Sequence, residues 1–371
     1  MKYTLSVTNS CNLSCKYCYI GKKNDVMGLN IVEEIIKFIF KYTPKTERIE
    51  IGFFGGEPLL ELGLIKGIAS RVESHPSFDP DRVEFTLTTN GTLLNEEAAR
   101  FINKRSIAYC VSCDGPPEVH NANRRFKNGR ASSPLIERNL KRALDLFPSV
   151  LVNAVYTPTT LSKLPSVVDY FSSLGLKQMY LSPDFSADWS KDDIALLPEV
   201  YNNVADRYIE FYRVGRPHFI NLIDLKITAM LRGGYQATER CSMGRGEFAF
   251  APSGNIYPCE RLIGNDDGVT HCIGNILTGL NASGMACKTA EGGEVNARCA
   301  VCAIKEYCMN WCGCSNYFSS GFYNRVSPFL CASERAAITA AHRAFQIIEN
   351  ESKVTFNEHL SGMPAANCMK G

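Results

Sequence analysis

Three cysteines near the start of the chain are spaced so that they could hold a metal cluster. Cys11, Cys15 and Cys18 form a C-x3-C-x2-C run (CNLSCKYC) that directly follows a segment expected to be a strand. Each iron of a [4Fe–4S] cube takes one thiolate, so three cysteines hold three irons and leave the fourth open to a small chelating molecule. The run therefore predicts a catalytic iron–sulfur site. A zinc site and three unrelated thiols are the alternatives.

With Tyr17 before its last cysteine, the run resembles the signature of the radical SAM superfamily. In that family the open iron binds the amino and carboxylate groups of S-adenosylmethionine (SAM). One electron then releases a 5′-deoxyadenosyl radical, which abstracts a hydrogen atom from the substrate. The resemblance implies that the protein places the cofactor and the cofactor carries the chemistry. It also implies that Tyr17 contacts SAM.

The bulk properties fit a large enzyme that offers no nucleic-acid or membrane surface. A length of 371 residues predicts one large domain and a smaller one. The net charge of +2 gives no broad basic face, and no apolar run reaches the ~18–20 residues of a membrane span. The chain begins without a signal-peptide pattern. Its sixteen cysteines therefore indicate metal ligation in a reducing cytoplasm rather than a disulfide framework.

Strand-like and helix-like segments alternate through the first half of the chain. The strands are expected at residues 3–7, 48–54, 83–88, 106–112, 150–156 and 178–182. The helices between them are expected at 29–42, 59–72, 96–103, 134–146 and 165–174, with Asn95 as an N-cap. This alternation predicts an α/β fold with a parallel sheet. Six units are two short of a closed barrel, so we expect an open (β/α)6 TIM-like partial barrel.

Glycine-rich or polar motifs follow most of the expected strands. They read GGEP at 55–58, TNGT at 89–92 and DGP at 114–116. Parallel α/β folds build their sites at the carboxyl ends of the strands, so these motifs are expected at one mouth. The GGEP stretch resembles a family motif whose backbone contacts the SAM amino group, with an ordinary tight turn as the alternative. We assign Gly55, Gly56 and Asn90 to the cofactor site and Glu57 to its support.

The stretch VSCDGPPEVHNANR at 111–124 resembles the S-x-D-G-x4-H-x3-R stretch of anaerobic sulfatase maturases and related peptide-modifying enzymes. By that resemblance Ser112 and Arg124 help to hold SAM, and an arginine fork suits its carboxylate. Arg125 is the alternative if the register is shifted by one residue. Gly56 and Leu181, which lies near the end of the sixth strand, match other SAM-contacting positions of that group.

Cysteines become dense again in the last third of the chain, where seven of them match the pattern of the SPASM domain, C-x9–15-G-x4-C, C-x2-C-x5-C-x3-C and C. The resemblance implies two auxiliary [4Fe–4S] clusters and thus three clusters in all. The first is assigned to Cys241, Cys259 and Cys312, and the second to Cys299, Cys302, Cys308 and Cys331. A zinc ribbon on four of these cysteines is the alternative, but it leaves three unexplained. Cluster binding is expected to contribute much of the folding free energy of this domain.

The ligands of the first auxiliary cluster are incomplete. Sulfatase maturases place a further cysteine shortly after the first one, whereas residues 242–247 here read SMGRGE. The fourth ligand is then Cys272, Cys287 or Cys314, or it is absent and leaves an iron for a substrate thiolate.

A second departure concerns the residue after Cys259. Sulfatase maturases have an aspartate there as the proposed catalytic base, and this chain has Glu260, whose carboxylate sits one methylene further out. Proton transfer requires hydrogen-bond reach. Glu260 is a candidate base, and a surface ion pair with Arg261 or Arg245 is the alternative.

These observations divide the chain into four parts. Residues 1–184 are expected to form the partial barrel, 185–240 a helical bridge, 241–331 the auxiliary-cluster domain, and 332–371 a capping helix and tail. Nothing before the first strand reads as a leader-peptide-binding domain, so such a function would belong to a separate protein.

The resemblance implies a radical SAM/SPASM oxidoreductase that matures a ribosomally made peptide. Hydrogen abstraction would be followed by oxidation to a thioether or carbon–carbon crosslink, with an auxiliary cluster accepting the second electron. The runner-up is a sulfatase maturase that forms formylglycine from Cys or Ser. From another class, a non-catalytic electron carrier is disfavoured by the SAM-site motifs. The implied partners are the precursor peptide and an electron donor such as flavodoxin or ferredoxin.

Overall fold

The computed structural model describes residues 1–236, 239–281, 297–309, 311–351 and 359. The chain forms two compact units, each assembled from separate segments. The first unit contains Met1–Val111, Asn123–Pro148 and Ser242–Ala290. The second contains Ser112–Ala122, Ser149–Cys241 and Glu291–Gly371. The four-part division expected from the sequence stays a prediction.

The sheet of the first unit is centred on four parallel strands. Neighbours in order are β1 (Lys2–Thr8), β2 (Ile49–Gly55), β3 (Val83–Thr89) and β4 (Ala108–Ser112), whose last residue belongs to the second unit. β8 (Glu247–Phe250) pairs in parallel with the other side of β1. The antiparallel strands β9 (Asn255–Tyr257), β10 (Gly274–Asn275) and β11 (Gly279–Leu280) follow beyond it. Part of the cysteine-rich segment therefore extends the sheet of the N-terminal part.

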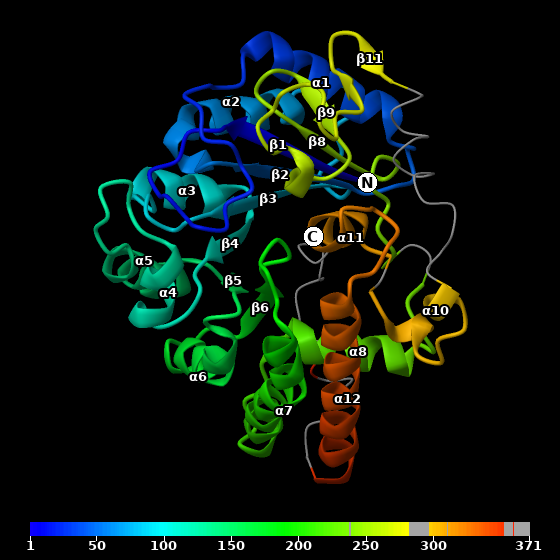
Figure 1. The fold of residues 1–371 in the computed structure, drawn as a ribbon. Helices are drawn as coiled ribbons and strands as arrows, with labels where there is room; N and C mark the ends of the chain where they lie inside the picture. Colours follow the sequence, from blue (N-terminus) through cyan, green and yellow to red (C-terminus); the bar gives the residue numbers. More distant parts are fainter. Residues whose placement is uncertain (237–238, 282–296, 310, 352–358, 360–371) are drawn as a thin grey trace. The chain divides into compact units, whose positions relative to one another are not determined.

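The helices of the first unit lie between these strands along the chain (Figure 1). They are α1 (Leu29–Tyr42), η1 (Pro58–Glu61), α2 (Leu62–Glu73), α3 (Glu96–Lys104), α5 (Ser133–Leu146) and η4 (Glu260–Leu262). In α1, Ile31, Ile35 and Ile39 are buried at a spacing of four residues, as on the apolar face of an amphipathic helix. The predicted N-cap of α3 is confirmed, because the Asn95 side chain accepts a 2.8 Å hydrogen bond from Ala98 N.

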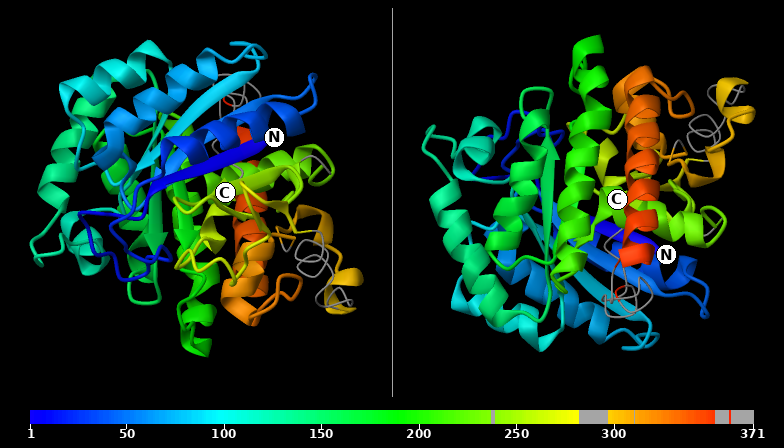
Figure 2. Two further views of the ribbon diagram at one scale, coloured as in Figure 1. Left: turned by 90° about the horizontal axis from the view of Figure 1, so that it is seen from above. Right: turned by 90° about the horizontal axis from the view of Figure 1, so that it is seen from below.

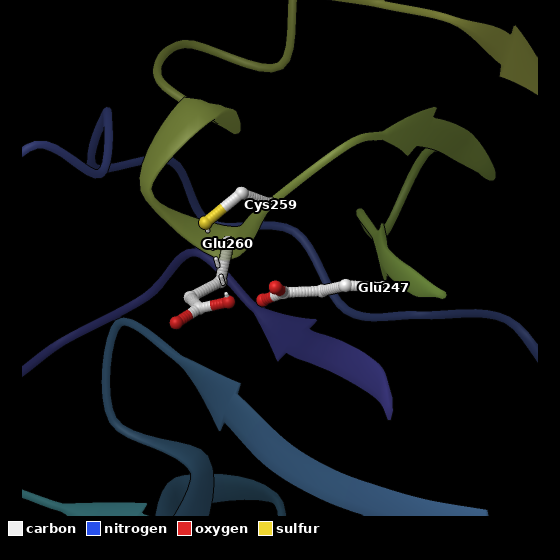
Figure 3. A group of neighbouring side chains, drawn as sticks. All are labelled: Glu247, Cys259 and Glu260. Carbon is white, nitrogen blue, oxygen red and sulfur yellow. Dashed lines mark hydrogen bonds between the residues drawn. The ribbon is translucent and has the colours of Figure 1, made fainter. Parts of the chain in front are cut away.

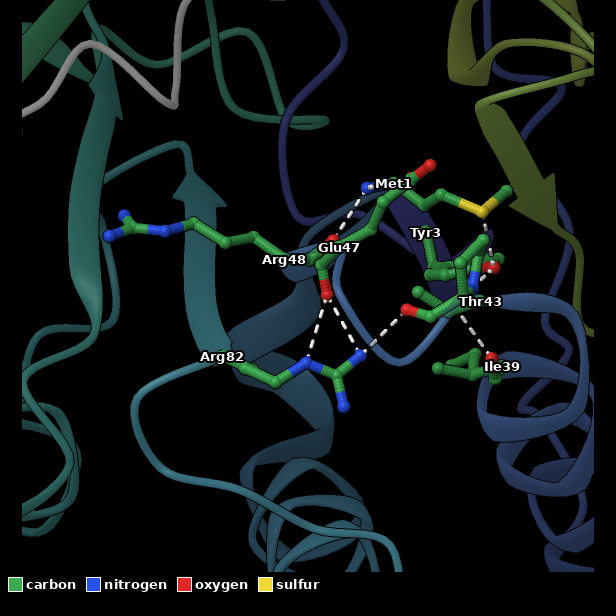
Figure 4. A network of polar contacts seen from close by, with 8 residues as sticks. Met1, Tyr3, Ile39, Thr43, Glu47, Arg48 and Arg82 are labelled. Atoms are coloured by element: carbon green, nitrogen blue, oxygen red, sulfur yellow. Dashed lines mark hydrogen bonds and ion pairs between the residues drawn. The ribbon is translucent and has the colours of Figure 1, made fainter.

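Alternate residues of β1 face opposite sides of the sheet. Tyr3, Leu5 and Val7 are fully buried, and the Tyr3 ring lies edge-on to Phe38 of α1. The Tyr3 hydroxyl also contacts Thr43 Oγ1 at 2.8 Å, just past the end of α1 (Figure 4). The other face of β1 presents Lys2, Thr4 and Ser6, so it is polar.

A second group of polar contacts fixes the loop that leads into β2. The Arg82 guanidinium donates hydrogen bonds to the backbone carbonyls of Pro44 and Glu47, and the terminal ammonium of Met1 donates one to Arg48 O (Figure 4). These contacts hold the start of β2 in register beside β1.

The second unit carries three further parallel strands, β5 (Val150–Tyr156), β6 (Gln178–Pro183) and β7 (Phe219–Ile220). Its helices are α4 (Pro117–Asn123), η2 (Leu161–Lys163), α6 (Leu164–Ser173), α7 (Lys191–Arg213), α8 (Asn221–Leu231), α10 (Ala297–Ala300), η5 (Lys305–Tyr307), α11 (Gly313–Ser320) and α12 (Pro328–Glu351). The long helices α7 and α12 lie side by side in each view (Figures 1 and 2). Tyr201 OH of α7 and Ser333 Oγ of α12 meet at 2.8 Å in the buried layer between them.

The predicted fold class is confirmed. The chain is a mixed α/β protein with the parallel sheet of a partial barrel, followed by a cysteine-rich region and a long final helix. Several boundaries differ from the expected ranges, most of them by one residue. The fourth strand begins at Ala108 because Ser106 has a φ of 50°, which is incompatible with extended backbone. Within the expected helical bridge, α7 begins at Lys191, where Ser190 and Asp193 form a capping box. Among the described residues, no helix is long and apolar enough to cross a membrane.

Candidate functional site

The loop with Cys11, Cys15 and Cys18 follows β1 and is held by a second segment of the first unit. Ser14 N donates to Arg125 O at 2.8 Å, Lys16 N donates to Asn123 O at 3.1 Å, and Leu13 forms an isolated bridge with Phe126. Through these backbone contacts, residues 123–126 lie antiparallel to the cysteine loop. The segment that carries the predicted arginine therefore lies directly beside the cysteines.

Arg124 faces the cysteine loop, and Arg125 does not. The buried Arg124 places Nη1 3.9 Å from Cys15 Sγ and its guanidinium carbon 5.2 Å from the centre of the Tyr17 ring. Arg125 is exposed, and its Nη1 donates to Gly129 O. The geometry therefore joins three of the predicted site residues and selects the first of the two arginines.

The two glycines of the GGEP turn allow a close approach of backbone to backbone. Gly55 has a φ of 136°, and a Cβ there would lie 2.2 Å from Thr8 O. A Cβ on Gly56 would lie 2.1 Å from Ser10 O. Gly56 N donates to Thr8 O and Glu57 N to Ser10 O, both at 2.8 Å. The turn thus fixes the backbone that leads into Cys11.

Glu57 connects the GGEP turn to the TNGT turn. Its fully buried carboxylate accepts hydrogen bonds from Thr89 Oγ1 and Asn90 N at 2.7 Å, and from Leu59 N at 3.0 Å. Burial raises the pKa of Glu57, although these hydrogen bonds oppose the shift. Because its carboxylate oxygens accept hydrogen bonds from protein donors, Glu57 stabilises the GGEP and TNGT turns.

The Asn90 side chain holds the first part of the cysteine loop. Its Nδ2 donates to Asn12 Oδ1 at 2.8 Å and approaches Cys11 Sγ at 3.8 Å. Thr92 Oγ1 donates to Asn90 Oδ1 at 2.6 Å, and Asn12 Nδ2 donates to Thr92 Oγ1 at 2.8 Å. This small ring of hydrogen bonds fixes the backbone around Cys11.

Lys22 lies close to all three cysteines of the loop, and the sequence analysis missed it. It forms a hydrogen bond with Cys18, and the charges of Cys18, Cys11 and Cys15 raise its pKa although burial alone would lower it. No motif marks this lysine. Three thiols flanked by Arg124 and Lys22 fit an anionic iron–sulfur cluster, because the two cations balance thiolate charge.

Ser112 and Leu181 belong to the second unit, and their predicted contact with SAM stays a prediction. Leu181 is buried, and its N–H donates to Asn221 Oδ1 at 2.7 Å. Near Ser112, the buried His120 accepts a 3.3 Å hydrogen bond at Nδ1 from Asp114 N. His120 therefore orders the loop after β4.

Three of the four cysteines assigned to the second auxiliary cluster line one cavity of the second unit. The cavity has a volume of about 740 Å³, and Cys299, Cys302 and Cys331 lie in its wall together with three arginines. The fourth cysteine, Cys308, is buried and lies near the ammonium of Lys226. Three thiols that share a roomy, cation-rich cavity fit an anionic cluster.

The cysteines assigned to the first auxiliary cluster lie in both units. Within the second unit Cys241 and Cys312 are hydrogen-bonded, and Cys314 Sγ lies 3.5 Å from Cys312 Sγ. Hydrogen bonds from Cys241 and Cys314 hold the pKa of the Cys312 thiol well below its usual value. Cys259 and Cys272 belong to the first unit. This grouping favours Cys314 as the additional thiol, and Cys287 lies outside the described residues.

Glu260 is buried in the first unit beside Lys2, and not at the surface where the alternative ion pair would place it, although the charge of Arg261 still acts on its carboxylate. Lys2 Nζ lies 3.7 Å from Glu260 Oε1 and 3.6 Å from Glu247 Oε1. Although burial alone would raise the pKa of Glu260, the Lys2 ammonium and a hydrogen bond with Glu247 lower it. At the start of β2, burial raises the pKa of Glu50 to about 7.

Glu247, Cys259 and Glu260 also form a set of possible metal ligands. Their ligand atoms lie within 4.8 Å of one another, and all three residues are buried (Figure 3). The Lys2 ammonium already supplies a cation beside both carboxylates. The sequence indicated Glu260 from its place after Cys259, but local patterns do not predict its pairing with residue 2.

The family model of the radical SAM superfamily matches residues 5–171. Among curated relatives, the radical SAM cyclopropyl synthase TigE of Paramaledivibacter caminithermalis is 24% identical over 343 residues, which cover 83% of this chain and 66% of TigE. A cysteine-type anaerobic sulfatase-maturating enzyme of Clostridium perfringens is 25% identical, with 68% and 72% covered.

Solved structures show the same fold. Native anSMEcpe with bound AdoMet and Cp18Cys peptide matches with a TM-score of 0.77 and 20% identity, covering 94% of this chain and 99% of that one. SuiB of Streptococcus suis bound to its precursor peptide SuiA matches with a TM-score of 0.61 and 14% identity, covering 89% and 75%. Both of these structures hold a peptide.

Proposed function

The chain is a radical SAM enzyme that resembles anaerobic sulfatase-maturating enzymes and peptide-modifying SPASM maturases, and we propose that it oxidatively modifies a ribosomally made peptide. Cys11, Cys15 and Cys18 would hold the catalytic cluster. When bound, this cluster and SAM supply a 5′-deoxyadenosyl radical that removes a hydrogen atom from the substrate. The expected product is a thioether or carbon–carbon crosslink.

One observation carries this proposal: the first unit gathers three thiols and Arg124 on a scaffold of glycine backbone, Asn90 and Glu57. The Arg124 guanidinium, next to Cys15 and Tyr17, would bind the SAM carboxylate with two parallel hydrogen bonds. The backbone of Gly55 and Gly56 would meet the SAM amino group. In the second unit, Ser112 and Leu181 are proposed to complete the SAM site.

The other thiols support an oxidative rather than a hydrolytic reaction. We assign Cys241, Cys259 and Cys312 to one auxiliary cluster, with Cys314 as the favoured further ligand. We assign Cys299, Cys302, Cys308 and Cys331 to the other. A reducing cytoplasm, where thiols stay available as ligands, is the proposed compartment. Glu260, kept ionised by Lys2, is the proposed acceptor of the proton that the substrate loses.

The runner-up, a sulfatase maturase, is supported by the similarity to the Clostridium perfringens enzyme. Glu260 weakens it, because those enzymes carry an aspartate at this place as their proposed base. The test is to incubate the anaerobically reconstituted chain with SAM and dithionite, together with either a sulfatase-type cysteine peptide or short peptides encoded beside its gene. 5′-Deoxyadenosine and the peptide masses are then measured. We expect 5′-deoxyadenosine and a crosslinked gene-neighbour peptide.

A mass change to formylglycine on the sulfatase peptide would instead establish the runner-up. The absence of 5′-deoxyadenosine with every peptide, in protein that holds its clusters, would leave only an electron carrier. A separate leader-binding protein is a further proposed partner. If the chain alone does not bind a peptide, the assay is repeated with this protein added as a control.

A further inference from the structure

The cavity that contains Cys299, Cys302 and Cys331 has a strongly cationic rim. Arg298, Arg325 and Arg335 line it, and no aspartate or glutamate is among its described lining residues. The three arginines come from different segments, namely α10, the loop before α12, and α12 itself. All three are exposed. Positive charge therefore surrounds the mouth of the cavity.

Two exposed apolar side chains lie three residues from these arginines in the sequence, Val301 after Arg298 and Phe322 before Arg325. Val301 is 85% exposed and Phe322 is 42% exposed. The Arg325 guanidinium carbon lies 3.9 Å from the centre of the Phe322 ring, a cation–π contact that holds the arginine over an apolar face. We call Arg298, Arg325, Arg335, Val301 and Phe322 the arginine rim.

The rim arginines differ from other arginines of the same unit. Five arginines elsewhere in this unit form ion pairs with a carboxylate, namely the exposed Arg213, Arg232 and Arg240 and the half-buried Arg207 and Arg343. Among the described residues, no such ion pair involves Arg298 or Arg325. Arg335 hydrogen-bonds Cys331, one helical turn before it on α12. Balancing a cluster's charge accounts for Arg335. It does not account for Arg298 and Arg325, which are exposed and have no acidic partner within the part of the chain that the structure describes.

We propose that the arginine rim docks the acidic face of a small one-electron carrier protein of the flavodoxin class. This inference rests on the proposed function, because it requires a cluster on Cys299, Cys302, Cys308 and Cys331. SAM cleavage and substrate oxidation both need single electrons to cross the protein surface. A small charged patch that includes exposed apolar side chains suits a weak, short-lived redox complex. One electron passes from the reduced flavin to the cluster, and no bond forms or breaks.

The experiment follows electron transfer to the full, anaerobically reconstituted chain by stopped-flow absorption, with reduced flavodoxin as the probe. The double variant Arg298→Glu/Arg325→Glu is compared with Arg207→Glu/Arg232→Glu, which changes charge equally elsewhere on the unit. At low salt we expect the first variant to slow the second-order reaction roughly 10–100-fold, since electrostatic steering acts at that scale. The control should change it less than about twofold. The difference should shrink at high salt because the charges are then screened.

Equal rates for both variants at low salt would overturn the proposal, as would a loss of affinity for an acidic substrate peptide with unchanged flavodoxin kinetics. Iron per chain and reduction by dithionite are measured in parallel. An intact chain with about 4 irons instead of about 12 would contradict the proposed function itself. If the double variant loses iron, the single variant Arg325→Gln is tested in its place, because Arg325 lies apart from the cysteines in the sequence. An unchanged rate of electron transfer from flavodoxin in this variant would again overturn the proposal.

Discussion

The two main cysteine sets of the chain are positioned by different means. In the first unit, the loop of Cys11, Cys15 and Cys18 begins at the end of a buried strand and is bonded by backbone to residues 123–127 and 56–57. In the second unit, Cys299, Cys302 and Cys308 lie on or between short helices of three or four residues. Their backbone bonds are local, such as Cys302 N to Cys299 O and Cys308 N to Lys305 O.

The difference indicates which set of thiols the fold positions without bound metal. Non-local hydrogen bonds hold the first set in place, so the fold itself positions these thiols. The second set has mostly local bonds and partly exposed thiols. We therefore expect metal to contribute folding free energy mainly to the second set. In each set one anchoring carboxylate accepts a hydrogen bond from the backbone near the cysteines, Glu57 from Asn90 N beside the first set and Glu334 from Met309 N in the second.

The strongest way to break this comparison is to remove each set of ligands separately. We expect Cys11→Ala/Cys15→Ala/Cys18→Ala to abolish 5′-deoxyadenosine formation and to lower iron from about 12 to about 8 per chain. Hydrogen exchange of the loop should change little. Cys302→Ser/Cys331→Ser should also remove about 4 irons, but with a large loss of exchange protection across residues 297–331. Similar exchange changes at both sites would show that the comparison is mistaken.

The next effect concerns the anchor of the second set. The buried Lys226 Nζ lies 2.6 Å from Glu334 Oε2, which also accepts a 2.6 Å hydrogen bond from Met309 N, the residue after Cys308. Burial alone would lower the pKa of Lys226, but the Glu334 carboxylate raises it well above its usual value.

We expect Lys226→Met to lower the free energy of unfolding by about 3–5 kcal/mol, because removing one partner of a buried pair leaves the other charge uncompensated. Denaturant unfolding of the cluster-loaded protein measures this. The exposed Lys191→Met is the matched control and should stay within about 0.5 kcal/mol of the parent. If both variants were equally stable, the pair would not anchor the cysteine segment.

Much of the fold could be predicted from the sequence because its signals are local. The apolar period of α1 and the compact apolar run of β5 gave their bounds to the residue. Other features depend on contacts that no local pattern encodes. The pairing of β8 with β1 and the contact of Glu260 with Lys2 join the two ends of the first unit's sequence. Lys22 belongs to no motif, so only its position reveals it.

Removing Glu57, the anchoring carboxylate of the first cysteine set, should lower the free energy of unfolding less than Lys226→Met does. Glu57→Ala leaves the Thr89 hydroxyl and the N–H groups of Asn90 and Leu59 without their acceptor. We expect a loss of about 2–4 kcal/mol, since each buried unsatisfied donor costs roughly 1–3 kcal/mol and some donors will find water. Denaturant unfolding at pH 5 measures this. Glu61→Ala, at a half-buried glutamate one helical turn later, is the control.

The pH dependence gives this prediction a sign. Burial raises the pKa of Glu57, so the folded chain holds this proton more tightly than the unfolded chain. The contribution of Glu57 is fully present below its ordinary pKa and is lost as pH rises through the raised one. The gap between parent and Glu57→Ala should therefore narrow above pH 5. A gap that widens with pH would mean that the carboxylate is stabilised as the anion.

The smallest expected effect is a difference in SAM affinity between variants of two adjacent arginines, Arg124 and Arg125, beside the first cysteine set. Arg124 contacts Cys15 and Tyr17, whereas Arg125 is exposed and reaches only the Gly129 carbonyl. We expect Arg124→Ala to weaken SAM binding roughly 10–100-fold, because a charged hydrogen-bond pair contributes about 1.5–3 kcal/mol. Arg125→Ala should leave it unchanged. Equilibrium binding of SAM to reconstituted protein measures both variants.

Arg124→Lys sharpens the same prediction. Lysine keeps the charge but lacks the planar fork that binds a carboxylate with two parallel bonds. If the fork is what binds SAM, this variant should recover only part of the affinity, while iron content stays at the parent value. Full recovery would mean that Arg124 acts only as a charge beside the Cys15 thiolate. Equal losses in Arg124→Ala and Arg125→Ala would instead assign both arginines to the backbone path that holds the loop.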